Sequence, residues 1–160
     1  MTPAETVETT LRESGLHYER SGPQQFVVNL PGTRRLKTAC WLTIGDHAMS
    51  IEAFVMRQPD ENAEQVYRYL LEHNARMYAV AWSVDDSGDV YLTGKLPLAA
   101  VTPDEIDRVL GAVLEYADGS FNALVQLGFG SSIRREWAWR VKNNESLANL
   151  AAFEEFAKRE

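Results

Sequence analysis

The sequence feature that most constrains this chain is an apolar stripe at helical spacing in its second half. From Ile106 to Val125, apolar residues recur every three or four positions, the spacing that places side chains on one face of a helix. The preceding Thr102-Pro103-Asp104-Glu105 combines an N-cap threonine, a proline at the first helical position and an acid three residues after the cap. The pattern predicts a long central core helix. Its apolar positions are Ile106, Val109, Leu110, Val113, Leu114, Ala117, Phe121, Leu124 and Val125.

Two predicted hairpins supply the sheet that this helix would cover. Residues 36–44 and 47–56 flank Gly45-Asp46, which predicts a two-residue turn with Ile44 opposite His47. Strands at 79–84 and 89–96 are joined through residues 85–88, and we expect every plausible register of this hairpin to put Trp82 and Tyr91 on the same face. On the first hairpin the alternation predicts a core face and a mixed face. The core face carries Cys40, Leu42, Met49 and Ile51, and the mixed face carries Trp41 and Phe54.

The other predicted elements complete an α+β fold. A capping box at residues 2–5 begins a helix at 3–14, and Asp60 is the expected N-cap of a helix that runs to about residue 74. Short strand pieces are expected at 18–20 and 26–30. The fold class is therefore an antiparallel sheet packed with helices, in the order α-βββ-α-ββ-α, followed by a C-terminal helical extension.

The end of the long helix is expected at Gly128-Phe129-Gly130, because two glycines disfavour helix continuation. Two shorter helical pieces are predicted after it, at 131–141 and 146–158. The 160 residues, 45% apolar and 24% charged, are enough for one folded core without cross-links. We expect one domain at 1–130 and a C-terminal extension at 131–160.

The succession of motifs resembles the YbjN family, whose fold is similar to that of the type III secretion chaperones. The resemblance covers roughly residues 1–130, and residues 128–140 resemble an extension found in actinobacterial members. It implies a chaperone-like, often dimeric, non-enzymatic protein of a family labelled as regulators of sensory transduction. The motifs that carry it are His73-Asn74-Ala75-Arg76, Asp85-Asp86-Ser87-Gly88-Asp89, Leu96-Pro97-Leu98 and Val101-Thr102-Pro103.

No catalytic or metal-binding pattern is recognisable in the sequence. The three histidines, at positions 17, 47 and 73, have no ligand at zinc spacing beside them, and Cys40 has no identifiable activating base. Residues 85–89 superficially resemble a calcium loop, but a hairpin turn is favoured because the distal glutamate is missing. Residues 128–132 could cradle a phosphate, or they could be a helix stop followed by an N-cap. We expect no catalytic residue, no metal and no cofactor.

Two groups of residues are candidates for binding a protein partner. The extension carries a local charge of about +3 between residues 131 and 142 on an acidic chain, and arginine and tryptophan are enriched at binding hot spots. An equally weighted alternative is that Trp137 packs on the core while the arginines neutralise acids of the same chain. The second group lies on the mixed face of the sheet. The candidates are Arg134, Arg135, Trp137, Trp139 and Arg140, and then Trp41, Phe54, Trp82 and Tyr91.

The leading functional hypothesis is a chaperone-like adaptor or regulator that binds a protein client and forms a homodimer. The alternative from another class is a small-molecule-binding module or a cryptic enzyme, and a third is a structural subunit of a larger complex. The first residues lack a basic and apolar leader pattern, and no apolar run approaches a membrane span. We therefore expect a cytoplasmic protein without a membrane partner.

The charge of the chain predicts that it does not recognise nucleic acid. The net charge is −7, and residues 1–130 carry 10 basic against 18 acidic side chains, so phosphate is repelled. In a mobility-shift experiment at physiological salt, we expect no sequence-specific binding of DNA or RNA. A sequence-dependent shift at nanomolar protein concentration would contradict this expectation.

Overall fold

The computed structural model describes residues 1–157, so the predicted helix end at Lys158 lies outside the described residues. The α-helices are α1 (Pro3–Ser14), α2 (Ala63–Asn74), α3 (Pro103–Lys142) and the short α4 (Glu154–Ala157), and the 3-10 helices are η1 (Leu98–Ala100) and η2 (Ala148–Phe153). The strands are β1 (His17–Gly22), β2 (Gln25–Pro31), β3 (Lys37–Ile44), β4 (Ala48–Met56), β5 (Val80–Val84) and β6 (Val90–Pro97).

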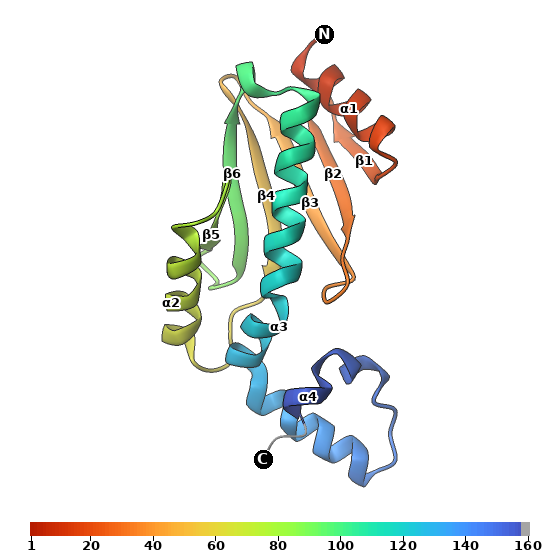
Figure 1. Cartoon of the computed structure of the whole chain (residues 1–160), viewed down its shortest axis with the longest axis vertical. Helices are drawn as coiled ribbons and strands as arrows, with labels where there is room; N and C mark the ends of the chain where they lie inside the picture. Colours follow the sequence, from red (N-terminus) through yellow and green to blue (C-terminus); the bar gives the residue numbers. More distant parts are fainter. Residues whose placement is uncertain (158–160) are drawn as a thin grey trace.

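The six strands form one antiparallel sheet in the order β1-β2-β3-β4-β6-β5. Figure 1 shows α3 running along the length of the sheet, with α1 and α2 at its two sides. This arrangement confirms the predicted α+β class with helices packed on an antiparallel sheet. One detail differs, because the two strand pieces expected before residue 31 are separate, paired strands.

The core lies between α3 and one face of the sheet. Alternate residues of β2, β3 and β4 are buried, as expected for an antiparallel sheet with one covered face. Most of the predicted stripe of α3 is buried, with Ile106, Val113 and Leu124 fully inaccessible, whereas Leu114 and Phe121 are only partly buried. Hence α3 is the central core helix, as expected. The largest fully buried side chains include Leu11, Phe26, Leu30, Leu42, Met49, Ile51 and Leu92.

The register predicted for the first hairpin is wrong by two residues. Ile44 pairs with Met49, and Gly45 pairs with Ala48 through a backbone hydrogen bond of 2.8 Å, so Asp46-His47 forms the turn. A shift of two positions leaves the faces unchanged, because side chains alternate with period two. The predicted core and mixed faces of this hairpin are therefore correct.

The register predicted for the second hairpin is wrong by one residue, and this moves Trp82 to the other face. Asp85 pairs with Asp89, and Gly88 adopts a φ of 83° in the three-residue loop between them. Trp82 consequently faces Leu92 on the core side, whereas Tyr91 faces Ser83 on the uncovered side. A one-residue change in a hairpin loop exchanges the two faces of a strand.

Two predictions about helix ends are also wrong. Asp60 does not cap α2, and its carboxylate bonds Arg57 instead. The helix begins after Asn62, whose backbone is in the left-handed conformation. The long helix does not end at Gly128, because α3 continues to Lys142. Glycines disfavour a helix without forbidding it, and here tertiary contacts hold the segment. The boundary at residue 130 is therefore not a helix end, and the division into two parts stays a prediction.

The edge strand β5 is protected by a side chain of α2. The Asn74 amide oxygen accepts from the backbone N–H of Trp82 at 2.6 Å, and its amide nitrogen donates to the Trp82 carbonyl at 3.1 Å. One asparagine thus satisfies both outward-facing backbone groups of this residue, as a neighbouring strand would. Pairing of another strand is disfavoured at this edge.

A carboxylate of α3 fixes the loop between β2 and β3. One oxygen of Asp118 accepts from the backbone N–H groups of Thr33, Arg34 and Arg35, at 2.8 to 2.9 Å. Its other oxygen accepts from the Thr33 hydroxyl at 3.0 Å. Burial alone would raise the pKa of Asp118, but these donors outweigh it and the pKa is lowered. The charged carboxylate therefore ties the loop to the central helix.

Truncation of the central helix should cost stability. Leu110 is 3% exposed, so Leu110→Ala should lower the free energy of unfolding by about 2 to 5 kcal/mol through lost burial and a cavity. Leu114→Ala should cost less, because Leu114 is only partly buried. Urea unfolding measures both, with the 70% exposed Leu71→Ala as the matched control. A loss for Leu110→Ala as small as that of the control would contradict the assigned core.

The Asp118 contacts predict a pH-dependent stability. A carboxylate with a lowered pKa in the folded state stabilises the fold above its unfolded pKa of about 3.9, and the effect is lost as the pH falls through the folded pKa. Asp118→Asn should therefore be less stable than the wild type at neutral pH, and the difference should shrink below about pH 4. Thermal unfolding from pH 3 to 7 tests this, with Asp107→Asn on the same helix as the control. A constant difference across this range would contradict the role of the charge.

Candidate protein-docking surface

The face of the sheet opposite the helices carries an aromatic patch, which we define as Trp41, Phe54 and Tyr91. Trp41 on β3 and Phe54 on β4 are each 39% exposed, and Tyr91 on β6 pairs with Phe54. The rings of Phe54 and Tyr91 meet edge to face, with centroids 5.5 Å apart and an interplanar angle of 78°. Such a geometry is favourable for aromatic pairs. Three of the four sheet candidates therefore share the uncovered face.

Negative charges border this aromatic patch. Partial desolvation raises the pKa of Tyr91, and the nearby carboxylates of Asp85 and Asp89 raise it further. Glu52 acts in the same direction, and it pairs with Trp41 across β3 and β4. The aromatic patch thus has an apolar centre, with carboxylates on the side of Tyr91.

Arg35 supports one side of the aromatic patch from the β2–β3 loop. Its guanidinium lies 5.9 Å from the centroid of the Phe54 ring and 5.3 Å from that of Phe121 on α3. It also donates a hydrogen bond of 3.2 Å to the Phe54 carbonyl. Desolvation lowers the pKa of Arg35. These contacts restrict the backbone and the ring of Phe54, so less conformational entropy is lost when the ring binds a partner.

The segment before α2 meets the distal part of α3 in a polar junction, which we define as residues 57–62 with residues 127–132. The backbone N–H groups of Asp60 and Glu61 donate to the carbonyl of Gly128, at 2.9 and 3.1 Å. The Glu61 carboxylate accepts from the backbone N–H and the hydroxyl of Ser131, at 2.7 and 2.8 Å, and the N–H bond is the main reason its pKa is lowered.

The polar junction explains why position 128, in the run Gly128-Phe129-Gly130, is a glycine. A Cβ atom on Gly128 would lie 2.9 Å from the Cβ of Pro59, so the close approach requires glycine. External partners on the backbone of a helix are one cause of a bend. Figure 1 shows that α3 changes direction beyond the end of the sheet. Neither a helix stop nor a phosphate cradle is present at residues 128–132, where the backbone is helical.

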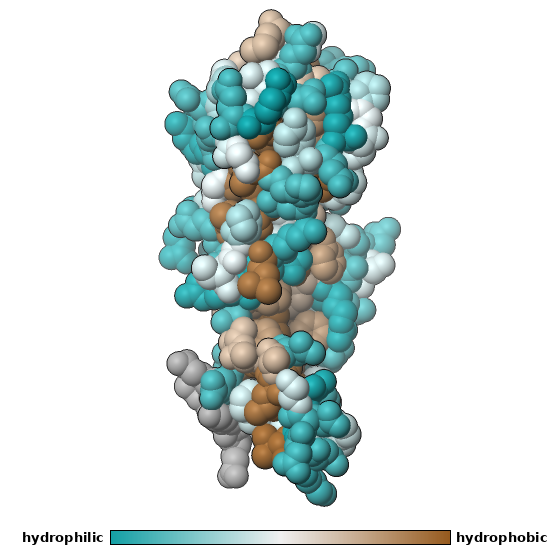
Figure 2. All heavy atoms as spheres, turned by 90° about the vertical axis from the view of Figure 1, so that its right-hand side faces the viewer, coloured by the Kyte–Doolittle hydropathy of each residue, from teal (hydrophilic) through white to brown (hydrophobic). Residues whose placement is uncertain are grey.

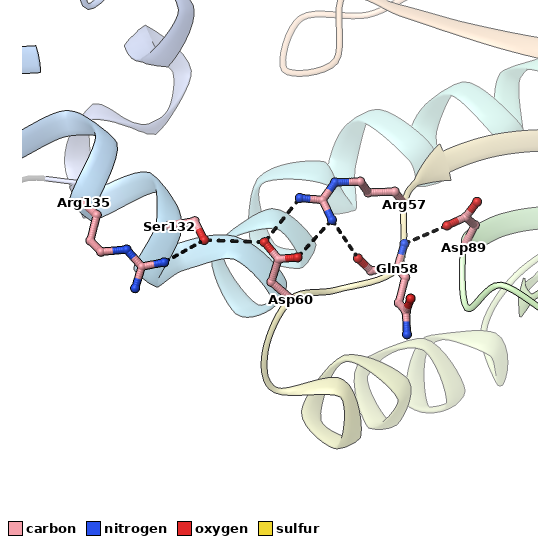
Figure 3. Close-up of polar contacts among 6 residues, drawn as sticks. All are labelled: Arg57, Gln58, Asp60, Asp89, Ser132 and Arg135. Carbon is pink, nitrogen blue, oxygen red and sulfur yellow. Dashed lines mark hydrogen bonds and ion pairs between the residues drawn. The ribbon is translucent and has the colours of Figure 1, made fainter. Parts of the chain in front are cut away.

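Side chains extend the polar junction on both sides, as Figure 3 shows. The Arg57 guanidinium donates to the two oxygens of the Asp60 carboxylate at 3.0 and 3.3 Å, and these bonds lower the pKa of Asp60. The same guanidinium lies 4.3 Å from the centroid of the Phe129 ring. Gln58 donates its backbone N–H to Asp89 at 2.8 Å. Ser132 lies between Asp60 and Arg135. The distal part of α3 is therefore linked to the β4–α2 segment, which in turn is bonded to the β5–β6 loop through Asp89.

The two tryptophans of the extension have different surroundings. Trp137 is 9% exposed and borders a shallow groove together with Leu147 and Ala151, which follow α3 in the chain. Trp139 is 53% exposed, and Val141 beside it is 55% exposed. The extension thus uses Trp137 for packing against its own C-terminal segment and presents Trp139 to solvent.

The three candidate arginines of the extension contact groups of the same chain. Arg134 donates to the Ser131 hydroxyl at 3.4 Å, and Arg135 donates to the Ser132 hydroxyl at 3.3 Å. Arg140 pairs with Glu136 at 2.7 Å and donates to the Ser146 carbonyl at 2.8 Å. A partner that used these arginines would compete with existing contacts. Their binding role stays a prediction.

Trp82, Cys40 and the acidic loop at residues 85–89 have structural surroundings. Trp82 is 5% exposed on the core face, so the prediction that it shares a face with Tyr91 is wrong. Cys40 is buried, and desolvation raises the pKa of its thiol to about 12, which disfavours a thiolate nucleophile. Asp85 accepts from the N–H groups of Ser87 and Asp89, as a hairpin turn requires.

Two further searches of the described residues concern metals and membranes. Within residues 1–157, no cluster of three histidine, cysteine, aspartate or glutamate side chains has the geometry to hold a metal ion. In the same part of the chain, no helix combines the length and the hydrophobicity needed to cross a membrane.

Sequence reasoning missed the polar junction and the groove along distal α3. The groove is lined by residues of three separate segments, including Arg57, Phe121, Ile133 and Phe153. A continuation of the apolar stripe beyond Val125, through Phe129 and Ile133, was the available signal. The expected glycine break obscured it.

A solved structure shares this fold. A chain of the heterodimeric complex ExoU-SpcU from the type III secretion system of Pseudomonas aeruginosa aligns with 69% of this chain and 91% of its own length. The TM-score is 0.51 and the sequence identity is 17%. The match supports the predicted similarity to secretion chaperones at the level of fold.

Sequence relatives cover nearly the whole chain. The uncharacterized proteins Rv0487 of Mycobacterium tuberculosis and ML2442 of Mycobacterium leprae are each 51% identical to it over 152 residues. Each alignment covers 92% of this chain and 83% of the relative. An alignment of this extent includes at least part of residues 131–160.

The profile of the YbjN family, described as "Putative bacterial sensory transduction regulator", matches residues 3–126. These residues include the six strands, α1, α2 and the part of α3 that covers the sheet. With this match over most of its length and relatives at 51% identity, the chain belongs to the YbjN family.

Proposed function

We propose that this protein is a non-enzymatic, chaperone-like adaptor or regulator that binds a protein client through the aromatic patch and acts as a homodimer. The observation that carries the proposal is the exposure of Trp41 and Phe54 on a sheet face that no helix within residues 1–157 covers. Large aromatic side chains are over-represented at binding hot spots, and a rigid aromatic surface loses little entropy on binding.

The chemistry around the aromatic patch indicates the kind of client. Glu52, Asp85 and Asp89 place negative charge beside Tyr91, and the whole chain has a net charge of −7. An apolar segment flanked by lysine or arginine would meet both the aromatic centre and the carboxylates beside Tyr91. We therefore propose a client segment of this composition.

The comparisons support this class of function without naming a client. Membership of a family described as regulators, and a fold shared with a chain of a secretion-system complex, are in line with binding another protein. The buried, protonated state of the Cys40 thiol favours this proposal over a thiol-dependent enzyme. The location of the protein in the cytoplasm is part of the same proposal.

The proposal predicts that the aromatic patch is required for client capture. The double variant Trp41→Ala with Phe54→Ala should bind its client at least about 30-fold more weakly, because two hot-spot side chains are removed. Affinity purification from the native cell with mass spectrometry identifies the client, and titration with that purified client then measures the affinity of each variant. Binding should also weaken as salt is raised, if basic residues of the client meet the carboxylates beside Tyr91.

The matched control is Leu71→Ala, which removes an exposed apolar side chain from the outer face of α2. A partner recovered by the wild type and by this control, and lost by the double variant, would support the proposal. Equal recovery by all three proteins would contradict it, provided that circular dichroism shows the double variant to be folded.

A further inference from the structure

The loop between β2 and β3 presents a basic tip, which we define as Arg34, Leu36 and Lys37. All three residues are exposed, and Leu36 is 80% exposed. Neither basic side chain has an ion pair within residues 1–157. Figure 2 faces the side of the molecule on which this loop lies in Figure 1, and it shows hydrophobic side chains at the surface among hydrophilic ones. The basic tip therefore offers one apolar and two positively charged side chains to a partner.

The basic tip is fixed by contacts with the rest of the chain. The Asp118 carboxylate accepts from three consecutive backbone N–H groups of the loop, those of residues 33–35. A Cβ atom at Gly32 would collide with the Arg35 carbonyl and with the Asp118 carboxylate, so this close approach requires glycine. A rigid loop loses little conformational entropy on binding. Leu36 is thus displayed on a preorganised support.

The basic tip and the acidic β5–β6 loop lie on opposite sides of the aromatic patch. β3 and β6 are the two neighbours of β4, and because the strands are antiparallel, both loops share one end of the sheet with the end of β4. Figure 1 shows the two loops at this end. Arg35, within the β2–β3 loop, contacts the Phe54 ring, whereas Asp85 and Asp89 lie beside Tyr91.

The acidic side also presents charge to solvent. The β5–β6 loop has three aspartates in residues 85–89, and Asp86 is exposed without an ion pair in the described part of the chain. Lys95, on the same face of β6 as Tyr91, lies toward the other end of that strand. Around the aromatic patch, positive charge therefore lies on the β3 side and negative charge on the β6 side.

We propose that two copies of this chain pack these faces together, so that the basic tip of each copy meets Tyr91 and the β5–β6 loop of the other. A surface with opposite charges on its two sides is complementary to itself after a twofold rotation about an axis along the strands. Such a rotation brings the two aromatic patches face to face and joins positive to negative charge at both margins. The resulting homodimer is closed, with the same contacts formed twice.

The composition of the basic tip favours a second copy as the occupant. The proposed client segment is apolar and flanked by lysine or arginine, and Arg34-Arg35-Leu36-Lys37 has this composition in the chain itself. Because the second copy occupies the proposed client surface, this dimer rests on the proposed function. Client and second copy therefore compete, and the homodimer is the form without client. A patch used by clients alone would leave the protein monomeric.

Charge reversal on each side tests this dimer. Arg34→Glu with Lys37→Glu, and separately Asp86→Lys with Ser87→Lys, place like charges at both margins of a homodimer. Each variant should dimerise at least about a hundredfold more weakly than the wild type, because like charges then oppose each other twice. An equimolar mixture of the two variants should form a heterodimer, because both margins again join opposite charges. Sedimentation equilibrium over a range of protein concentrations measures these constants.

The matched control is Arg12→Glu with Arg76→Glu, which makes the same change in net charge as the tip variant at exposed positions of other elements. It should dimerise like the wild type. The substituted residues of all three variants are exposed, and circular dichroism verifies that each variant is folded. Recovery of the dimer on mixing is a result that misfolded variants cannot give.

A wild type that stays monomeric at all concentrations, a dimer that survives both reversals, or variants that stay monomeric when mixed would overturn the proposal. The tip variant keeps Trp41 and Phe54, so it should bind the client at least as tightly as the wild type. Loss of client binding by the Trp41→Ala and Phe54→Ala variant, without recovery of dimers on mixing, would contradict the dimer alone. Recovery of dimers on mixing, with unchanged client binding by that variant, would contradict the client surface alone.

Discussion

The rest of the structure depends on the burial of one sheet face beneath α3. Alternate residues of the strands and every third or fourth residue of α3 meet in a single core, in which Ile106, Val113 and Leu124 are inaccessible to solvent. Because an antiparallel sheet can leave its second face in water, covering one face is sufficient for stability. Trp41 and Phe54 are exposed on the second face, which is the client surface that we propose.

The polar junction determines what happens to α3 after it leaves the sheet. The carbonyl of Gly128 and the N–H of Ser131 are bonded to the segment before α2, and Pro59 packs where a side chain at position 128 would stand. These contacts hold the helix through a sequence that would otherwise favour its end. They also set the direction of the extension, and so they position the groove along distal α3 and the segment that follows this helix.

The sequence by itself determined the elements and their buried faces, because periods of 2 and 3.6 residues are local properties. It therefore predicted the α+β class, the stripe of α3 and the placement of Trp41 and Phe54 on the face opposite the core. The tertiary structure decided what depends on loops and on distant contacts. The β5–β6 loop is one residue shorter than predicted, and this places Trp82 in the core. Contacts from Pro59, Asp60 and Glu61 keep α3 helical through Gly128. Such outcomes are set by small free-energy differences between alternative local conformations, and packing between segments far apart in the sequence selects among them.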